Sequence, residues 1–187
     1  MKRSTFIKTI GLLPLIPTSM QLDHLQKVAS TFANTELMPV LFIGHGDPMN
    51  ALLDNPFTRQ LSTTGANILK KYKPNVILVV SAHWLTQGTF VCTNPKPETI
   101  HDFGGFPDEL FAVQYPAIGS PEYADKTAEL AQEIQKTNEW GLDHGAWTIL
   151  KHLVAAADVP GFQVSIEYHL PMQYHFDLAK QLQSLRR

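Results

Sequence analysis

Cysteine is almost absent from this chain of 187 residues, which contains only Cys92. A single thiol permits neither an internal disulfide nor a zinc site built from cysteines. Any metal ion in this protein would therefore need histidine or carboxylate ligands. The chain has eight histidines, so a histidine-based metal site stays open.

The sequence also lacks a strong charge of either sign and a long apolar run. Its formal net charge is −2 at pH 7, and it shows no basic face of the kind that nucleic acid needs. No stretch approaches the ~20 apolar residues of a membrane-spanning helix. We therefore expect neither nucleic acid nor a membrane as a partner.

Several common enzyme motifs are missing. The sequence has no Gly-x-Ser-x-Gly elbow, phosphate-binding loop, Gly-x-Gly-x-x-Gly, His-Glu-x-x-His or Cys-x-x-Cys. Ser81 and His83 stand two apart on a predicted strand, where roughly 6–7 Å separates them, too far for an easy hydrogen bond between nucleophile and base. No motif therefore competes with a histidine site.

Residues 1–36 have the layout of an export signal, with a basic start and a short apolar stretch at 10–16. The run KRSTFIK resembles a twin-arginine signal, although Ser4 stands where the second arginine belongs. The alternative is a leader without signal function. We expect a periplasmic protein if the signal functions and a cytoplasmic one otherwise, with the catalytic domain in residues 37–187.

Strand and helix patterns alternate along residues 37–187. Apolar runs predict strands, and amphipathic patterns with capping residues predict helices. The run VILVVSA indicates a strand that is buried on both faces, as in parallel or mixed sheets. The alternation predicts an α/β fold with a central, mostly parallel or mixed sheet flanked by helices. Expected strands are 38–43, 76–82 and 162–167; expected helices are 56–71, 121–136, 146–157 and 172–186, with a loop at 95–107.

Histidines follow two of the predicted strands. His45 lies in Gly-His-Gly after 38–43, and His83 lies in Ser-Ala-His-Trp after 76–82. Ligands of such sheets gather beyond the carboxyl ends of the strands, and imidazole is a common metal ligand. We predict that both histidines belong to one site. An exposed turn residue at 45 and a structural histidine at 83 remain the alternatives.

Two further histidines lie in segments typical of functional sites. His101 begins HDFGGFP, a loop with aromatic residues and paired glycines that is suited to a lid or a pocket wall. His144 follows Asp143 directly and precedes a predicted helix, where an acid/base or substrate-orienting role is expected. A plain connecting loop and a surface histidine are the respective alternatives.

Four blocks in this order resemble the class III extradiol ring-cleavage dioxygenases, most closely the branch similar to DOPA 4,5-dioxygenase. The resemblance covers about residues 38–187. It implies a non-haem enzyme that opens catechol-type rings with O2, using one Fe(II) or Zn(II) ion. The blocks are LFIGHGDPMNAL, SAHW, TIHDFGGFPDELF with QYPAIGSPE, and GLDHGAW.

The resemblance also implies roles for individual residues. His45 and His83 correspond to metal ligands, His144 would sit over the substrate and take part in proton transfer, and His101 would line the pocket. Asp47 stands where the family usually has serine. Its carboxylate would either hydrogen-bond a metal-binding histidine or perturb the site.

The family domain continues beyond the last predicted helix with further histidine segments, so the resemblance implies a domain that is incomplete relative to the family. The alternative function is an inactive, metal- or ligand-binding remnant. An incomplete sheet would expose an edge and apolar surface, which favours either instability or association into a homo-oligomer. A metal-dependent hydrolase is the third interpretation, with Asp47, Asp102 and Asp143 as the carboxylates that it would require.

Overall fold

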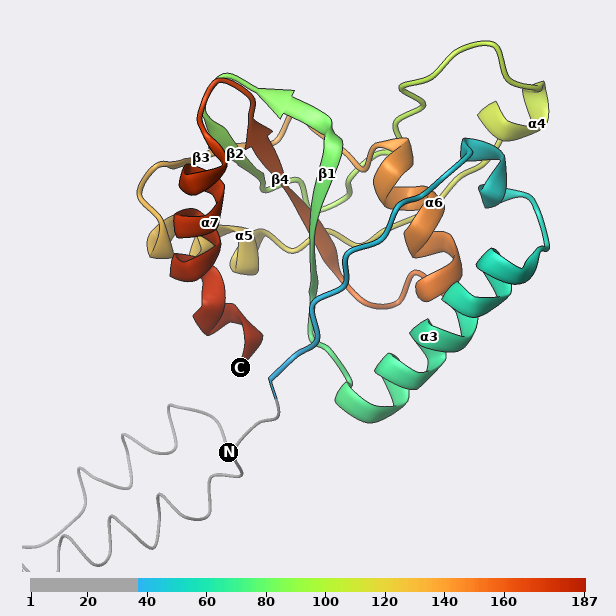
Figure 1. Cartoon of the computed structure of the whole chain (residues 1–187), viewed down its shortest axis with the longest axis horizontal. Helices are drawn as coiled ribbons and strands as arrows, with labels where there is room; N and C mark the ends of the chain where they lie inside the picture. Colours follow the sequence, from blue (N-terminus) through green and yellow to red (C-terminus); the bar gives the residue numbers. More distant parts are fainter. Residues whose placement is uncertain (1–36) are drawn as a thin grey trace, which may run out of the picture. The chain divides into compact units, whose positions relative to one another are not determined.

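A computed structural model describes residues 37–187, which form one compact unit (Figure 1). The predicted export signal lies outside the described residues. Within them, no helix has the length and apolarity to cross a membrane. The elements in chain order are η1 (Pro48–Ala51), α3 (Pro56–Tyr72), β1 (Ile77–Thr86), β2 (Thr89–Cys92), α4 (Asp108–Phe111), α5 (Pro121–Leu130), β3 (Ile134–Thr137), α6 (His144–Leu153), β4 (Gly161–Glu167), α7 (Met172–Gln181) and η2 (Leu182–Arg186).

The four strands form one mixed sheet in the order β1-β4-β2-β3. β1 runs parallel to β4, and β2 runs parallel to β3. β2 and β4 are antiparallel. The predicted α/β fold with a central mixed sheet is therefore confirmed, and β1 is an edge strand.

Helices cover both faces of this sheet (Figure 1). α3 and α6 lie on one side, and α5 and α7 lie on the other. Side chains of β1 alternate between the two layers, because Ile77 and Val79 pack with the α6 side whereas Leu78 packs with the α5 and α7 side. On β4, Phe162 and Val164 belong to the α5 and α7 layer. Apolar side chains on both faces of β1 explain why its sequence reads as a continuous apolar run.

Helix α3 begins where its sequence predicts. Asn55 is the N-cap, and its side chain accepts a hydrogen bond from the backbone of Thr58, whose own side chain caps Asn55 in return. Pro56 occupies the first helical position, where its missing N–H costs nothing. The helix ends at Lys73, which adopts a left-handed conformation with φ of 47°.

The expected strand at 38–43 is not formed. The segment is extended, but it belongs to no strand, and the side chains of Val40 and Phe42 are 73% and 104% exposed. Its backbone contacts the end of the chain, where Met38 N–H donates to Arg186 O at 2.8 Å. The apolar run had indicated a buried strand. A strand also needs a partner backbone, and none pairs with 38–43 among residues 37–187.

The expected helix at 121–136 is too long. α5 ends at Leu130, and residues 134–137 instead form β3, which pairs with β2. Neither β2 nor β3 was predicted, because four residues are too few for a clear period-2 pattern. In the β3 segment, pairing with β2 overrides the helical tendency of the sequence.

Gly65 permits the close contact between α3 and α6. A Cβ atom at this position would lie 2.0 Å from the backbone oxygen of Leu153. Since that oxygen belongs to the main chain of α6, it cannot move aside without shifting the helix.

We predict that Gly65→Ala lowers the free energy of unfolding by about 1–3 kcal/mol through overpacking. Helix propensity alone would favour alanine by roughly 0.5–1 kcal/mol, so the two effects have opposite signs. Urea denaturation measures the change. Asn67→Ala, at an exposed position of the same helix, is the control and should raise the free energy of unfolding by up to about 0.7 kcal/mol, because alanine is the better helix former. A Gly65→Ala variant more stable than the parent would refute the close contact.

Candidate metal centre

His45 lies in a tight turn between the extended segment and η1. Gly46 adopts a φ of 67°, a left-handed conformation that favours glycine. The side chain of Asn50 donates to the carbonyl oxygen of His45 at 3.1 Å. Asp47 caps η1 by accepting a hydrogen bond from the Met49 N–H at 2.8 Å. The expectation that Asp47 hydrogen-bonds a histidine is therefore wrong, since its carboxylate is used at the start of η1.

His83 lies in an irregularity of β1. Val80 pairs with Val164 and Leu85 pairs with Ile166, so residues 81–84 of β1 lie opposite a single residue of β4. Such bulges bend a strand and redirect its side chains, and they are common beside active sites. The Ser-Ala-His-Trp block thus occupies the bulge instead of following the end of the strand.

His144 is the first residue of α6. Asp143 is the N-cap, and its side chain accepts from the backbone N–H of Ala146 at 3.1 Å. The helix therefore begins two residues before the predicted position. His144 is only 6% exposed.

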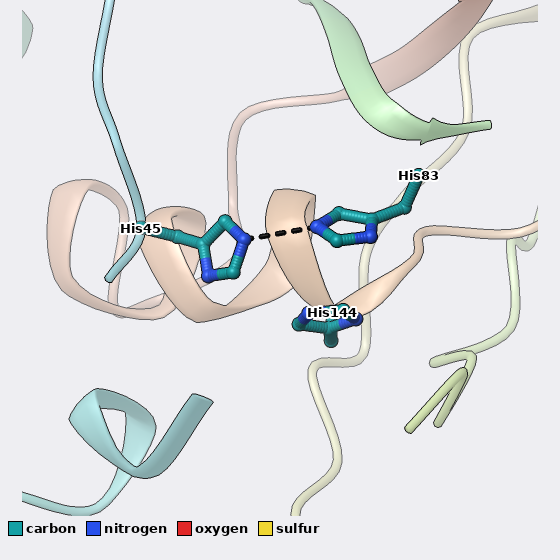
Figure 2. Close-up of side chains that lie close together, drawn as sticks. All are labelled: His45, His83 and His144. Carbon is teal, nitrogen blue, oxygen red and sulfur yellow. Dashed lines mark hydrogen bonds between the residues drawn. The ribbon is translucent and has the colours of Figure 1, made fainter. Parts of the chain in front are cut away.

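Three histidines from three separate elements converge (Figure 2). Nε2 of His45 and Nε2 of His83 are 2.9 Å apart. The ring centroid of His144 lies 4.0 Å from that of His83 and 4.9 Å from that of His45. One ring nitrogen from each residue can be chosen so that all three lie within 4.8 Å of one another. The structure thus brings His45, His83 and His144 into one site.

The separation of the two Nε2 atoms fits a shared metal ion. Metal–imidazole bonds of about 2.0–2.1 Å that meet at about 90–109° place the two nitrogens about 2.8–3.4 Å apart. The observed 2.9 Å lies in this range. The two rings therefore need little movement to bind one ion.

The surroundings of His45 favour its neutral form. Burial lowers the pKa of His45, and the nearby rings of His144 and His83 lower it further. A neutral imidazole retains the lone pair with which histidine binds a metal ion.

Asp102 is the carboxylate beside the three histidines. Its Oδ1 accepts a hydrogen bond from the backbone N–H of His144 and another from Nδ1 of the His144 ring, both at 2.9 Å. Its Oδ2 lies 3.8 Å from Nδ1 of His83. Burial alone would raise the pKa of Asp102, but the hydrogen bonds from His144 outweigh it and lower the pKa. The sequence had marked Asp102 only as a carboxylate for a hydrolase, because its contacts join residues that are distant in the chain.

A second carboxylate, that of Asp143, is fully buried beneath the site. It accepts hydrogen bonds from the Ser81 hydroxyl at 2.6 Å and from the Gln163 side chain at 2.8 Å. Ser81 Oγ also accepts from the N–H of His83 at 3.2 Å. Asp143 therefore links the bulge of β1 to β4 and to the start of α6.

His101 lies apart from the three histidines. Its Nε2 is 3.0 Å from the carbonyl oxygen of Val113, and its ring packs against Phe103 and Trp147. Phe103 makes an edge contact with His144, with 5.4 Å between ring centroids. The aromatic residue of the HDFGGFP block that contacts the site is thus Phe103.

Comparison with known proteins identifies the family. Residues 39–187 match the family model described as the catalytic LigB subunit of aromatic ring-opening dioxygenase. A 4,5-DOPA dioxygenase extradiol of Escherichia coli is 45% identical over 152 residues, which cover 80% of this chain and 55% of that protein. A 4,5-DOPA dioxygenase extradiol of Beta vulgaris is 38% identical over 151 residues, covering 78% of this chain and 56% of the relative.

A solved structure has the same fold. The crystal structure of an uncharacterized protein from Escherichia coli K12 matches with a TM-score of 0.65 and 38% sequence identity, over 80% of this chain and 55% of that one. The chain spans about half the length of the relatives that it matches. From residue 39 to its last residue, the chain belongs to the LigB family of aromatic ring-opening dioxygenases.

Proposed function

We propose that this chain binds one non-haem Fe(II) or Zn(II) ion through His45 and His83 and acts as an extradiol dioxygenase on a catechol-type ring. The convergence of His45, His83 and His144 is the observation that carries the proposal. The names of the relatives, 4,5-DOPA dioxygenase extradiol, support a substrate of the dihydroxyphenyl class.

Two imidazole ligands suit this chemistry. They are uncharged, so the ion keeps its full positive charge, and they leave coordination positions open. When bound, the ion would hold the catechol oxygens and O2 in contact with each other. The protein would supply the fixed positions of the two rings, of which His83 is 30% exposed and thus accessible to a ligand.

His144 would serve as the acid/base group. Its Nδ1 is held by Asp102 at 2.9 Å, so Nε2 is the nitrogen available to accept a proton from a substrate hydroxyl. Geometry comes before pKa in choosing such a base, and the ring of His144 lies beside those of both proposed ligands.

The aromatic residues of the HDFGGFP block would form a wall beside the substrate. Phe103 contacts His144 directly. The ring of His101 packs against Phe103, with 5.8 Å between ring centroids. A flat aromatic substrate can pack on such rings in edge or offset geometry. In this proposal His101 acts through Phe103.

The metal site predicts a selective effect of histidine removal. His45→Ala and His83→Ala should each weaken Zn(II) binding by more than the roughly 10–100-fold that an outer-shell change costs. Isothermal titration of the metal-free chain measures this, with Fe(II) titrated under anaerobic conditions. His169→Ala, at an exposed histidine, is the control and should bind one ion as the parent does. Undiminished binding in both site variants would contradict the assignment.

Gly145 predicts a second effect on the same site. A Cβ atom at 145 would lie 2.6 Å from Cδ2 of His83 and 2.9 Å from Oγ of Ser81. Gly145→Ala should therefore push the His83 ring out of place and weaken Zn(II) binding about 10–100-fold, as loss of an outer-shell support does. The matched control is Gly104→Ala, because no atom lies within 4 Å of a Cβ at that position. Equal affinity in the two variants would show that His83 needs no such space.

The activity itself is tested with Fe(II)-loaded protein and a catechol such as DOPA. We expect O2 uptake at an oxygen electrode and a new visible absorbance from the opened ring. His144→Ala should keep its metal and lose about 10²–10⁴-fold in rate, the usual contribution of an acid/base group.

The assay should be run on the chain alone and on the chain fused to the part of the Escherichia coli relative that has no counterpart here. Turnover only in the fusion would assign to this chain the metal-binding role without turnover. No turnover in either form would refute the dioxygenase proposal.

A further inference from the structure

One carboxylate oxygen carries both polar contacts between Asp102 and His144. Oδ1 accepts the backbone N–H and the ring Nδ1 of His144, each at 2.9 Å. The other oxygen, Oδ2, is 3.8 Å from Nδ1 of His83. A single side chain from the loop therefore meets two of the three histidines.

We propose that Asp102 is a positioning residue of this site, which fixes the tautomer and the orientation of His144 and places negative charge beside His83. The inference rests on the proposed function only in assigning a metal ion to the site. The hydrogen bonds themselves are independent of that assignment.

The tautomer follows from the chemistry of the donors. An ionised carboxylate can only accept hydrogen bonds, so the ring of His144 must carry its hydrogen on Nδ1. The lone pair of the neutral ring is then on Nε2. Histidines that bind metals or move protons are commonly held in this way by a carboxylate on the other nitrogen.

The other nearby carboxylates are engaged elsewhere. Asp143 accepts from Ser81, Gln163 and Ala146, and Asp47 caps η1. Among residues 37–187, Asp102 is therefore the carboxylate that contacts the ring of His144.

The backbone before Asp102 is held in place. The indole N–H of Trp147 donates to the carbonyl oxygen of Ile100 at 2.8 Å, and the N–H of Ile100 donates to Leu142 O at 2.8 Å. His101 is fixed on Val113. Because Trp147 lies on α6, one helix turn beyond His144, the same helix carries the histidine and anchors the loop that orients it.

The tautomer is measured directly by ¹⁵N NMR of the histidine side chains in the metal-free chain, with the His144 signals assigned through His144→Gln. We expect the Nδ1–H form for His144 in the parent. Asp102→Asn keeps an oxygen acceptor and should retain this form, whereas Asp102→Ala should shift the ring toward the Nε2–H form. An Nε2–H tautomer in the parent would overturn the proposal even if a variant failed to fold.

Metal affinity gives a second readout. Asp102→Ala should bind Zn(II) about 2–5-fold more weakly than the parent through loss of the charge that lies 3.8 Å from Nδ1 of His83, and Asp102→Asn, which loses the same charge, should match it. Asp108→Ala, which removes an equal charge at an exposed position of α4, should bind as the parent does. An unchanged tautomer in a folded Asp102→Ala variant would refute the positioning role. Failure of the parent to bind any metal would instead refute the proposed function and leave the tautomer result standing.

Discussion

The buried carboxylate of Asp143 is the constraint on which the site depends. A charge removed from water is tolerated only where hydrogen bonds replace its hydration. Here the donors are the Ser81 hydroxyl, the Gln163 amide and the Ala146 N–H. They come from β1, β4 and α6, so satisfying one carboxylate fixes a helix terminus against two neighbouring strands. His83 and His144 each lie within two residues of this network.

The three histidines are supported to different degrees. His144 is buried at the start of a helix. His83 lies in the β1 bulge, and its backbone N–H donates to the Ser81 hydroxyl. His45 depends on a turn made of Gly46 and η1, which follows a segment with exposed side chains. Two rings are thus set by the packed core, whereas the third is set by local hydrogen bonds. Asp102 adds a link from the loop, which ties the two core-supported rings to the aromatic wall.

Much of this arrangement follows from the sequence. The strand at 76–82, the helix capped by Asn55 and the grouping of His45 with His83 were predicted from short-range patterns. Such patterns report which side chains suit burial, but they do not report which backbone lies alongside. These patterns therefore did not predict that 38–43 is extended and unpaired, or that β2 pairs with β3. The same limit applied to Asp102, whose contact with His144 spans 42 residues, and to the β1 bulge, which exists only relative to β4.

The exposed segment before His45 connects metal binding at this centre with the folding stability of the domain. Residues 38–43 pair with no strand among residues 37–187. The hydrogen bonds that hold this segment lie at its two ends, at Met38 and in the turn around His45. An ion shared by His45 and His83 would act as a cross-link that closes a loop of almost forty residues. Loops of that length lose appreciable entropy on closure, and binding free energy would then become folding free energy. An ion bound at this centre would therefore favour the folded domain over the unfolded chain, in which the two histidines are not held together.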